Sequence, residues 1–494
     1  MSGCEDSETH YSFSHQGRNR LWSINVIEDL VAETLQELTT GFARLAWGPW
    51  LLLLLLGGGG FFLIYSRWLP FKYLPHAFDL LRGRYEDPAA KGQISHFQAL
   101  STALSGTIGM GNISGVALAI AIGGPGAIFW MWVTAIFGIA TKFFTCTLAV
   151  LYRHTDESGE VHGGPMYVIK RGLPRRFHFL ASWFAIAGMI GCLPMFGTNQ
   201  VIQITRDAVF IGNGWLDANA DHLLFNLTAG LVIAILTGLV VFGGIRSIGN
   251  VAAKTVPAMT ALYLIITLIA LVANISALPD VLALIVTDAF SGDALLGGSL
   301  LTVIQWGVQR GAFSNEAGIG TESLAHGAAR TNEPVREGLV AMCGPIIDTL
   351  LVCTATAMVI ILSDVWRSGD ANGVTLTANA FANLLGPIGL VGVFVCVLSF
   401  GITTIFTYSF YGSQCARFLW GKQGASGYRW GFIGLIIISS TLTLQTVVGL
   451  IDGMFALMAI PTMVSALWLA PEVMAAARLN FANLDASLSR DAQP

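Results

Sequence analysis

The sequence predicts an all-α polytopic membrane protein with eleven transmembrane helices, two of which are discontinuous. Composition is the first indication, because 54% of the 494 residues are hydrophobic and only 11% are charged, whereas soluble globular chains carry roughly 25% charged residues. Hydropathy and the distribution of positive charge then predict the number of spans. Two glycine-rich, polar stretches inside apolar segments predict the discontinuous helices.

Apolar segments long enough to cross a bilayer recur along the chain, since a spanning helix needs about 20 residues. The eleven predicted spans cover residues 47–66, 96–123, 128–152, 180–204, 223–242, 256–274, 296–320, 340–363, 389–418, 430–448 and 451–470.

Lysine and arginine residues provide a test of this number of spans. The loops after odd-numbered spans, together with the C-terminal tail, hold 19 of the 26 lysines and arginines, whereas the loops after even-numbered spans hold 2, Arg206 and Arg367. Positive residues collect on the cytoplasmic side of a membrane. The odd-numbered loops and the C-terminus are therefore predicted to be cytoplasmic, and the N-terminus to lie outside.

The two ends of the chain lie outside the apolar region. Residues 1–45 form a polar extension without the apolar core of a signal peptide. Within it, residues 29–44 have apolar side chains at helical spacing, which fits either a helix on the membrane surface or a plain lead-in helix. Residues 473–494 are predicted to form a cytoplasmic tail. No basic run with interleaved aromatic residues indicates a nucleic-acid partner.

The cysteines are predicted to be packing residues. Six of the 7 cysteines lie in apolar segments and none forms a CxxC pair, so neither disulfides nor metal ligands are expected.

The first discontinuous helix is predicted between residues 96 and 123. Glycine weakens a helix and adopts left-handed conformations at little cost. The backbone groups that a break exposes cannot be satisfied by lipid. A site for a ligand is the favoured hypothesis, and a packing face of small residues is the alternative. The interleaved glycine and polar residues are Ser105, Gly106, Thr107, Gly109, Gly111, Asn112, Ser114 and Gly115.

A second glycine-rich, polar stretch, Gln305–Thr321, reads QWGVQRGAFSNEAGIGT. Two interrupted helices in corresponding halves of a membrane protein are a sequence sign of a binding site at the midplane of an inverted-repeat transporter.

Ionisable residues inside predicted spans are costly and are usually paired or functional. Arg310 is predicted to pair with Glu316, six residues further on. For Lys142 a structural ion pair or a snorkelling position is favoured. Asp348 is predicted to pair with Arg310 or Lys142 rather than to titrate.

Five long stretches resemble the alanine/glycine:cation symporter family, within a similarity that covers about residues 45–472. They are GTIGMGNISGVALAIAIGGPGAIFWMWVTAIFGIATKF (106–143), GGPMYVIKRGLP (163–174), QWGVQRGAFSNEAGIGT (305–321), EPVREGLVAMCGPIIDTLLVCTAT (333–356) and YSFYGSQC (408–415).

The resemblance implies a leucine-transporter-type fold, with two inverted five-helix repeats preceded by one extra helix. The transport domain would cover residues 46–472, with the extra helix at 47–66, repeat one at 96–274 and repeat two at 296–470. The implied function is Na⁺-coupled import of alanine or glycine across the bacterial inner membrane. Serine or glutamine as cargo, and H⁺ as coupling ion, remain alternatives.

An enzyme is not expected. The chain has no HExxH, GxSxG or Cys–His arrangement, and His162 and His326 are predicted to be isolated polar packing or capping residues. No cofactor is expected besides the coupling ion, and the oligomeric state is open.

The amino-acid site is predicted from the needs of a carboxylate and an ammonium group taken out of water. Free N–H groups at a half-helix end suit the carboxylate. The substrate is therefore predicted to lie against Gly109, Gly111 and Asn112, with Phe313 as a wall, and a cap of the break is the alternative role for Asn112. By the resemblance, Asn199, Gln200 or Gln203 of the fourth span reaches the site, with the choice among them open and interhelical hydrogen bonding as the alternative.

The sodium site is predicted from hydroxyl oxygens, which suit a hard cation. By the resemblance, Thr403 or Thr404 meets the backbone carbonyls near Ser105 and Ile108. Tyr408 follows Thr404 by one helical turn and would line the substrate site. Family members often have tryptophan at this position, so the identity of the cargo stays open.

Overall fold

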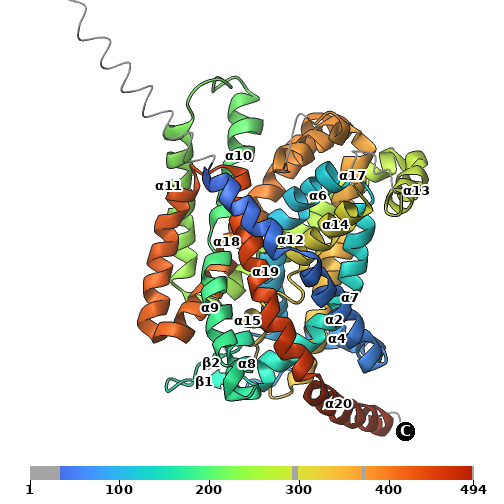
Figure 1. Cartoon of the computed structure of the whole chain (residues 1–494), viewed down its shortest axis with the longest axis vertical. Coiled ribbons are helices and arrows are strands. Elements are labelled where there is room, and N and C mark those ends of the chain that lie inside the picture. Colours follow the sequence, from blue (N-terminus) through green and yellow to red (C-terminus); the bar gives the residue numbers. More distant parts are fainter. Residues whose placement is uncertain (1–33, 292–298, 370–372, 492–494) are drawn as a thin grey trace, which may run out of the picture.

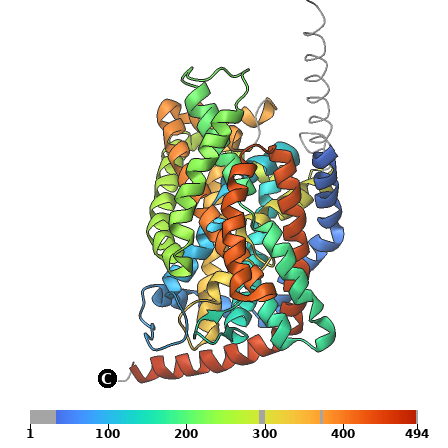
Figure 2. The same cartoon turned by 90° about the vertical axis from the view of Figure 1, so that its left-hand side faces the viewer.

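A computed structural model describes residues 34–291, 299–369 and 373–491. Within these ranges the protein is a bundle of long helices (Figure 1). A final helix lies across one end of the bundle (Figure 2).

The elements of the first half, from the extra helix to the predicted end of repeat one, include two π-helical turns, η1 and η3. Their bounds are α2 Pro49–Ser66, α3 Leu69–Lys72, α4 Leu74–Leu81, α5 His96–Thr107, η1 Gly111–Gly115, α6 Val116–Gly123, α7 Ala127–Leu151, β1 His154–Thr155, β2 Val161–His162, α8 Pro165–Gly172, η2 Arg175–Phe177, α9 Phe179–Gly191, α10 Met195–Ile204, η3 Thr205–Ile211, α11 Leu223–Val241 and α12 Gly244–Ala273.

The second half contains one more π-helical turn, η5. The bounds are η4 Ile275–Ala277, α13 Leu278–Asp288, α14 Leu300–Asn315, α15 Glu322–His326, α16 Pro334–Pro345, η5 Ile346–Cys353, α17 Thr354–Ser363, η6 Val365–Arg367, α18 Gly373–Ser439, α19 Leu444–Trp468 and α20 Ala470–Asp491.

The helical membrane class predicted from the sequence is confirmed, whereas the number eleven stays a prediction. In the described ranges, 8 helices are long and apolar enough to span a membrane, or up to 9 if a pair bent by 46° counts as one span. The predicted span 389–418 falls within α18, and the span 430–448 begins in α18 and ends in α19. The 67 residues of α18 are interrupted by non-helical backbone at Gly386 and Gly421. Another corresponds to α14, which has only 16 residues, and residues 296–298 lie outside the described ranges.

The first predicted break is the bent pair of α5 with η1 and α6. Helix α5 begins with a capping box, in which Ser95 and Gln98 exchange side-chain and backbone hydrogen bonds. It ends at Thr107, and Ile108 leaves the helical conformation. A Cβ atom on Gly109 would lie 2.2 Å from the Thr404 hydroxyl oxygen. Glycine here therefore lets α18 approach the break closely.

The second predicted break follows α14. Helix α14 ends at Asn315, and Glu316 takes a left-handed conformation with φ 57°. Gly318 and Gly320 also have positive φ, which L side chains adopt with difficulty. The chain becomes helical again at α15. Both breaks are buried among α7, α18 and η5.

The ends of the described chain only partly overlap the predicted extensions. Residues 34–46 are largely helical, while residues 1–33 of the predicted extension, with Cys4, lie outside the described ranges. At the other end, the predicted boundary at residue 472 falls inside α20, which packs on α7, α16 and α19. The β1–β2 hairpin lies at the same end of the bundle as α20 (Figure 1).

Candidate functional site

A small cavity lies between the two breaks. Its volume is about 10 Å³, close to the space that one water molecule needs. The walls come from the first break, α10, the second broken helix and α18, which are far apart in the sequence. The lining residues are Gly106, Thr107, Met110, Gly111, Phe196, Gly197, Phe313, Thr404 and Tyr408. Four of the predicted substrate residues, Gly111, Phe313, Thr404 and Tyr408, are therefore brought together here.

Hydroxyl and carbonyl oxygens meet next to this cavity. The Thr404 hydroxyl donates to the Ser105 carbonyl at 3.0 Å, and the Ser105 and Thr407 hydroxyls share a short hydrogen bond. The Thr404 hydroxyl also lies 2.8 Å from the Phe400 carbonyl of its own helix. The Thr403 hydroxyl likewise donates within α18, to the Ser399 carbonyl at 2.8 Å, but within the described residues it does not reach the first break. Of the two predicted threonines, only Thr404 faces the first break. Ile108 is buried at the end of α5, where its N–H donates to the Leu104 carbonyl.

Asn112 stabilises the first break from the inside. Its Oδ1 accepts the N–H of Gly109 at 2.9 Å, and its Nδ2 donates to Asp348 Oδ1 at 2.7 Å. Asn112 does not line the small cavity. The geometry gives Asn112 the position of a cap for the break, and Gly109 the position of the residue that it caps.

Asp348 connects the two breaks through the π-helical turn η5. Its carboxylate accepts hydrogen bonds from Asn112 of the first break and from Ser314 Oγ of the second, the latter at 2.9 Å. Thr349 Oγ1 donates to it as well, at 2.6 Å. The prediction that Asp348 pairs with Arg310 or Lys142 is wrong, since no ion pair joins it to either residue. The reason is that uncharged donors from three segments already surround the carboxylate.

Glu316 is held by two hydroxyl groups. Tyr408 donates to its Oε1 at 3.1 Å and Thr321 to its Oε2 at 2.7 Å. The hydroxyl of Tyr408 thus ties α18 to the second break.

The predicted pair of Arg310 with Glu316 is wrong. Arg310 instead forms a buried ion pair with Asp452 of α19. Glu316 lies beyond the end of α14, where the left-handed residue turns the chain away, whereas α19 brings Asp452 within reach. The Arg310 guanidinium also stacks on the rings of Trp306 and Phe313, at 5.2 and 5.4 Å from their centroids, so the pair supports one wall of the cavity.

Comparison with known proteins identifies the family of the chain. The pattern of the sodium:alanine symporter family matches residues 32–491. The chain belongs to the sodium:alanine symporter family. This confirms the resemblance seen in the sequence. Members of the family are transporters, so the chain is an amino-acid symporter and not an enzyme.

Relatives cover nearly the whole symporter. It is 39% identical to the sodium/alanine symporter AgcS of Methanococcus maripaludis over 432 residues, covering 87% of this chain and 93% of that protein. It is also 39% identical to an uncharacterized transporter of Haemophilus influenzae, with the same coverage. Identity to the probable sodium/glutamine symporter GlnT of Bacillus subtilis is 34%, covering 90% of each chain.

A solved structure supports the fold. The crystal structure of MhsT in complex with L-phenylalanine aligns with a TM-score of 0.55 over 79% of this symporter and 99% of that chain. The sequence identity is 14%, so this likeness shows the leucine-transporter-type fold alone.

The predicted amide residues of the symporter form their own network beside the start of α18. Gln200 donates to Asn199 and Gln203, while its Oε1 accepts from the Ser114 hydroxyl at 2.7 Å. Asn199 and Gln203 line a separate polar cavity of about 320 Å³. None of the three lines the small cavity, where α10 presents Phe196 and Gly197 instead.

Phe196 and Gly197 were not predicted as site residues, because the prediction for this span rested on its amide side chains, which follow them in the sequence. The sequence signal that could have found them is a glycine beside an aromatic residue within a predicted span.

A buried cluster at the beginning of α5 was also missed. The Glu337 carboxylate is hydrogen-bonded to His96 Nδ1 and, at 2.6 Å, to His326 Nδ1. The sequence had suggested that His326 is isolated, and the structure shows that it is not. His326 and Glu337 are 11 residues apart, but His96 is 241 residues from Glu337, so no local pattern could have revealed this contact between α5 and the second break.

Lys142 lies on α7 and is fully buried. In the described ranges it forms no ion pair within 4.0 Å, and its burial leaves no route for the ammonium group to the surface, so both the predicted structural ion pair and the snorkelling position are wrong. Its ammonium group packs close to Gly344 of α16. Six cysteines are buried and free, as predicted for packing residues.

Proposed function

We propose that this symporter imports alanine or glycine together with Na⁺ by alternating access. The observation that carries the proposal is the small cavity between the two breaks, bordered by glycine backbone and beside an oxygen cluster suited to a cation. In inverted-repeat transporters, half-helix ends at the midplane hold the charged groups of the cargo and unwound carbonyls hold the cation.

The size of the cavity favours a small cargo. Gly106, Gly111 and Gly197 leave backbone accessible, while the rings of Phe196, Phe313 and Tyr408 limit the space for a side chain. The Phe196 and Phe313 rings meet edge to face at 5.7 Å. A hydrophobic wall discriminates against each extra methylene by about 1–3 kcal/mol. Because the cavity has room for about one water molecule in this arrangement, it must widen to admit any amino acid, and glycine and alanine require the least widening.

For the coupling ion we assign Thr404, with the carbonyls of Ser105 and Ile108, to a Na⁺ site. The Thr404 hydroxyl and the Ser105 carbonyl are already within 3.0 Å of each other, so a cation would bind between α18 and the first break. Na⁺ bound there favours the arrangement in which the neighbouring amino-acid site is complete. By linkage, amino acid and Na⁺ each raise the affinity for the other.

The membrane arrangement follows from the charge distribution. We assign the odd-numbered loops and the tail 473–494 to the cytoplasm, and residues 1–45 to the outside of a bacterial inner membrane. The transport domain 46–472 would consist of the extra helix followed by the two repeats, 96–274 and 296–470.

Uptake of radiolabelled L-alanine into proteoliposomes tests the proposal. With an inward Na⁺ gradient we expect accumulation that excess glycine abolishes, and with an equal choline gradient we expect none. Equal uptake under both gradients would remove Na⁺ as the coupling ion. No uptake of alanine or glycine would remove the proposed cargo.

A second candidate is coupling to H⁺, which is favoured by the buried carboxyls of Asp348 and Glu316. In the part of the chain that the structure describes, neither forms an ion pair, and both lie at the breaks. Carboxyl groups within a membrane bundle are candidates for proton transfer. Alanine accumulation driven by a pH gradient without Na⁺ distinguishes this candidate. Serine and glutamine are the alternative cargoes, and competition assays with each decide between them.

A further inference from the structure

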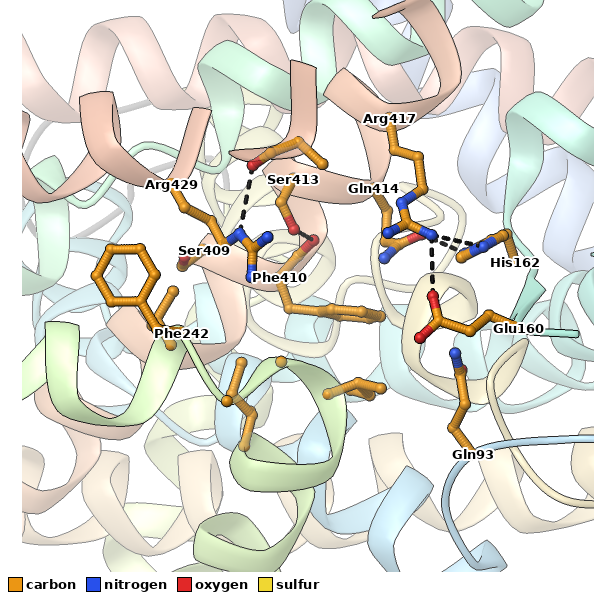
Figure 3. A pocket seen from close by; sticks show the side chains of 16 residues that line it. Gln93, Glu160, His162, Phe242, Ser409, Phe410, Ser413, Gln414, Arg417 and Arg429 are labelled. Atoms are coloured by element: carbon orange, nitrogen blue, oxygen red, sulfur yellow. Dashed lines mark hydrogen bonds and ion pairs between the residues drawn. The ribbon is translucent and has the colours of Figure 1, made fainter. Parts of the chain in front are cut away.

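A second pocket lies toward the end of the bundle that carries the β1–β2 hairpin (Figure 3). Its volume is about 280 Å³. Ser409 and Phe410, which directly follow Tyr408 on α18, form part of its wall, together with Glu160, His162 and Arg417. The pocket therefore begins one residue beyond the wall of the small cavity.

The pocket has polar donors without acceptors. The Ser409 hydroxyl is fully buried, and among the residues that the structure describes neither it nor Arg417 Nε has a hydrogen-bond partner. Arg429 lines the opposite side (Figure 3), where its Nε donates to the Ala425 carbonyl at 3.4 Å, close to the limit for a hydrogen bond. Buried donors without partners are costly. A ligand that fits this pocket must therefore bring acceptor oxygens.

The charged residues of the pocket also favour a ligand with acceptor oxygens. The Arg417 terminal nitrogen is already engaged by Glu160 at 3.1 Å and His162 at 2.8 Å. Within the described residues Arg429 forms no ion pair at 4.0 Å or less, and the charged groups that act on it are Arg417 and, more weakly, Glu160, so its guanidinium has no direct carboxylate partner. A guanidinium binds a carboxylate through charge-assisted hydrogen bonds, which are stronger than neutral ones. Glu160, across the pocket from Arg429 (Figure 3), offers a carboxylate for an ammonium group.

We infer that this pocket binds the transported amino acid on its way to the cytoplasm. Arg429 and the Ser409 hydroxyl would receive its carboxylate, and Glu160 its ammonium group. The inference rests on the proposed cargo and orientation. It adds a cytoplasmic exit site, separate from the central cavity, that determines the affinity of the transporter for internal amino acid.

The test compares the two faces of the membrane. Exchange of labelled alanine is measured at equal Na⁺ in right-side-out and in inside-out vesicles, for wild type, Arg429→Gln, Arg429→Lys and Ser409→Ala. Arg84→Gln is the matched control, because Arg84 lies in a loop on the same predicted side and pairs at the surface with Asp79.

We expect Arg429→Gln to raise the KM for cytoplasmic alanine about tenfold while the external KM stays within twofold of wild type. Ser409→Ala should raise the cytoplasmic KM about threefold, Arg429→Lys should restore much of the loss, and Arg84→Gln should match wild type. Equal changes at both faces, or no change at either, overturn the inference. If the wild type exchanges none of alanine, glycine, serine and glutamine, the proposed function has failed and the exit site with it.

Discussion

Both breaks must satisfy backbone N–H groups that leave the helical hydrogen-bond pattern, and they do so with different side chains. At the first, the exposed Gly109 N–H is capped by the amide of Asn112, and the broken segment itself contributes no charged residue. At the second, Asn315 Oδ1 accepts the N–H of Ala317 at 2.9 Å, and the carboxyl of Glu316 adds bonds to Thr321 and Tyr408. Only the second break therefore contains a group that can change its charge within its own segment.

The two breaks nevertheless share one anchor. Asn112 and Ser314, one from each break, donate to the carboxylate of Asp348, and Asn315 donates to the neighbouring Thr349 at 3.3 Å. These residues lie in the π-helical turn η5, and such turns often occur at functional sites. Cys353 of the same turn also contacts both Asn112 and Ser314, at 3.3 and 3.2 Å. The two breaks are therefore linked through two buried side chains of η5, and the carboxylate of Asp348 is the stronger acceptor of the two.

The largest effect is expected from Asp348→Ala, which removes the shared anchor. The hydrogen bonds from Asn112, Ser314 and Thr349 to the carboxylate are lost, each contributing on the order of 1 kcal/mol. As donors, Asn112 and Ser314 keep only their remaining contacts with the backbone carbonyl of residue 348 and with Cys353 Sγ. We expect alanine uptake to fall at least a hundredfold, with lowered thermal stability of the purified protein. The control is Asp288→Ala. Asp288 is a buried carboxylate at the end of α13, and its Oδ2 accepts the N–H of Gly126 at 2.7 Å. That variant should lose stability but keep uptake per folded molecule. Near-normal uptake by Asp348→Ala would refute the shared anchor.

A smaller and more selective effect is expected at the first break. Thr404→Val removes the hydroxyl that meets the Ser105 carbonyl, and we expect the Na⁺ concentration for half-maximal uptake to rise about tenfold, equivalent to one lost cation contact of ~1.4 kcal/mol. Thr403→Val is the neighbouring control, because both hydroxyls bond within α18 but only that of Thr404 also meets the Ser105 carbonyl. Sodium titrations of alanine uptake measure both. Equal sodium dependence of the two variants would contradict the assignment of Thr404.

At the second break, Glu316→Gln separates charge from shape. Glutamine retains an acceptor for the Tyr408 hydroxyl but cannot titrate. If Na⁺ alone is coupled, uptake under a Na⁺ gradient should stay within about threefold of wild type, since only neutral hydrogen bonds are exchanged. Loss of uptake together with its pH dependence would instead support H⁺ coupling. The experiment measures alanine uptake between pH 5.5 and 8 under the two gradients.

Some of these residues could be predicted from the sequence, whereas the contacts of others depend on the three-dimensional structure. The two breaks could be predicted from the sequence, because glycines such as Gly109 and Gly318 interrupt apolar segments that would otherwise be continuous helices. The resemblance directed attention to Thr404, and the structure places its hydroxyl against Ser105. The partner of Arg310 was not predictable, since Asp452 is 142 residues away and becomes a neighbour only when α19 packs on α14. A charge within a span indicates that a partner exists, but tertiary packing decides which one.

The smallest effect is expected outside the membrane, where the stability of the β1–β2 hairpin should depend on pH. This dependence must be known before a pH effect on uptake is assigned to Glu316. His162 Nε2 lies 2.8 Å from Arg417 Nη1, and its Nδ1 3.1 Å from Gln414 Oε1. Burial, and then the charge of Arg417, lowers the pKa of His162. The neutral ring accepts from Arg417, whereas a protonated ring cannot. The folded hairpin therefore binds fewer protons than the released one.

It follows that the hairpin contact is complete above about pH 6.5, the ordinary pKa of histidine, and is lost as the pH falls below that value. Asp156 stays ionised throughout this range, because the hydrogen bond from the Ser158 side chain leads the interactions that lower its pKa. We expect hydrogen exchange in residues 153–164, corrected for intrinsic rates, to rise about twofold to threefold from pH 7.5 to 5.5. His162→Gln should remove this dependence. A pH effect on uptake that persists in His162→Gln belongs to the membrane carboxyls, and one that disappears belongs to the hairpin.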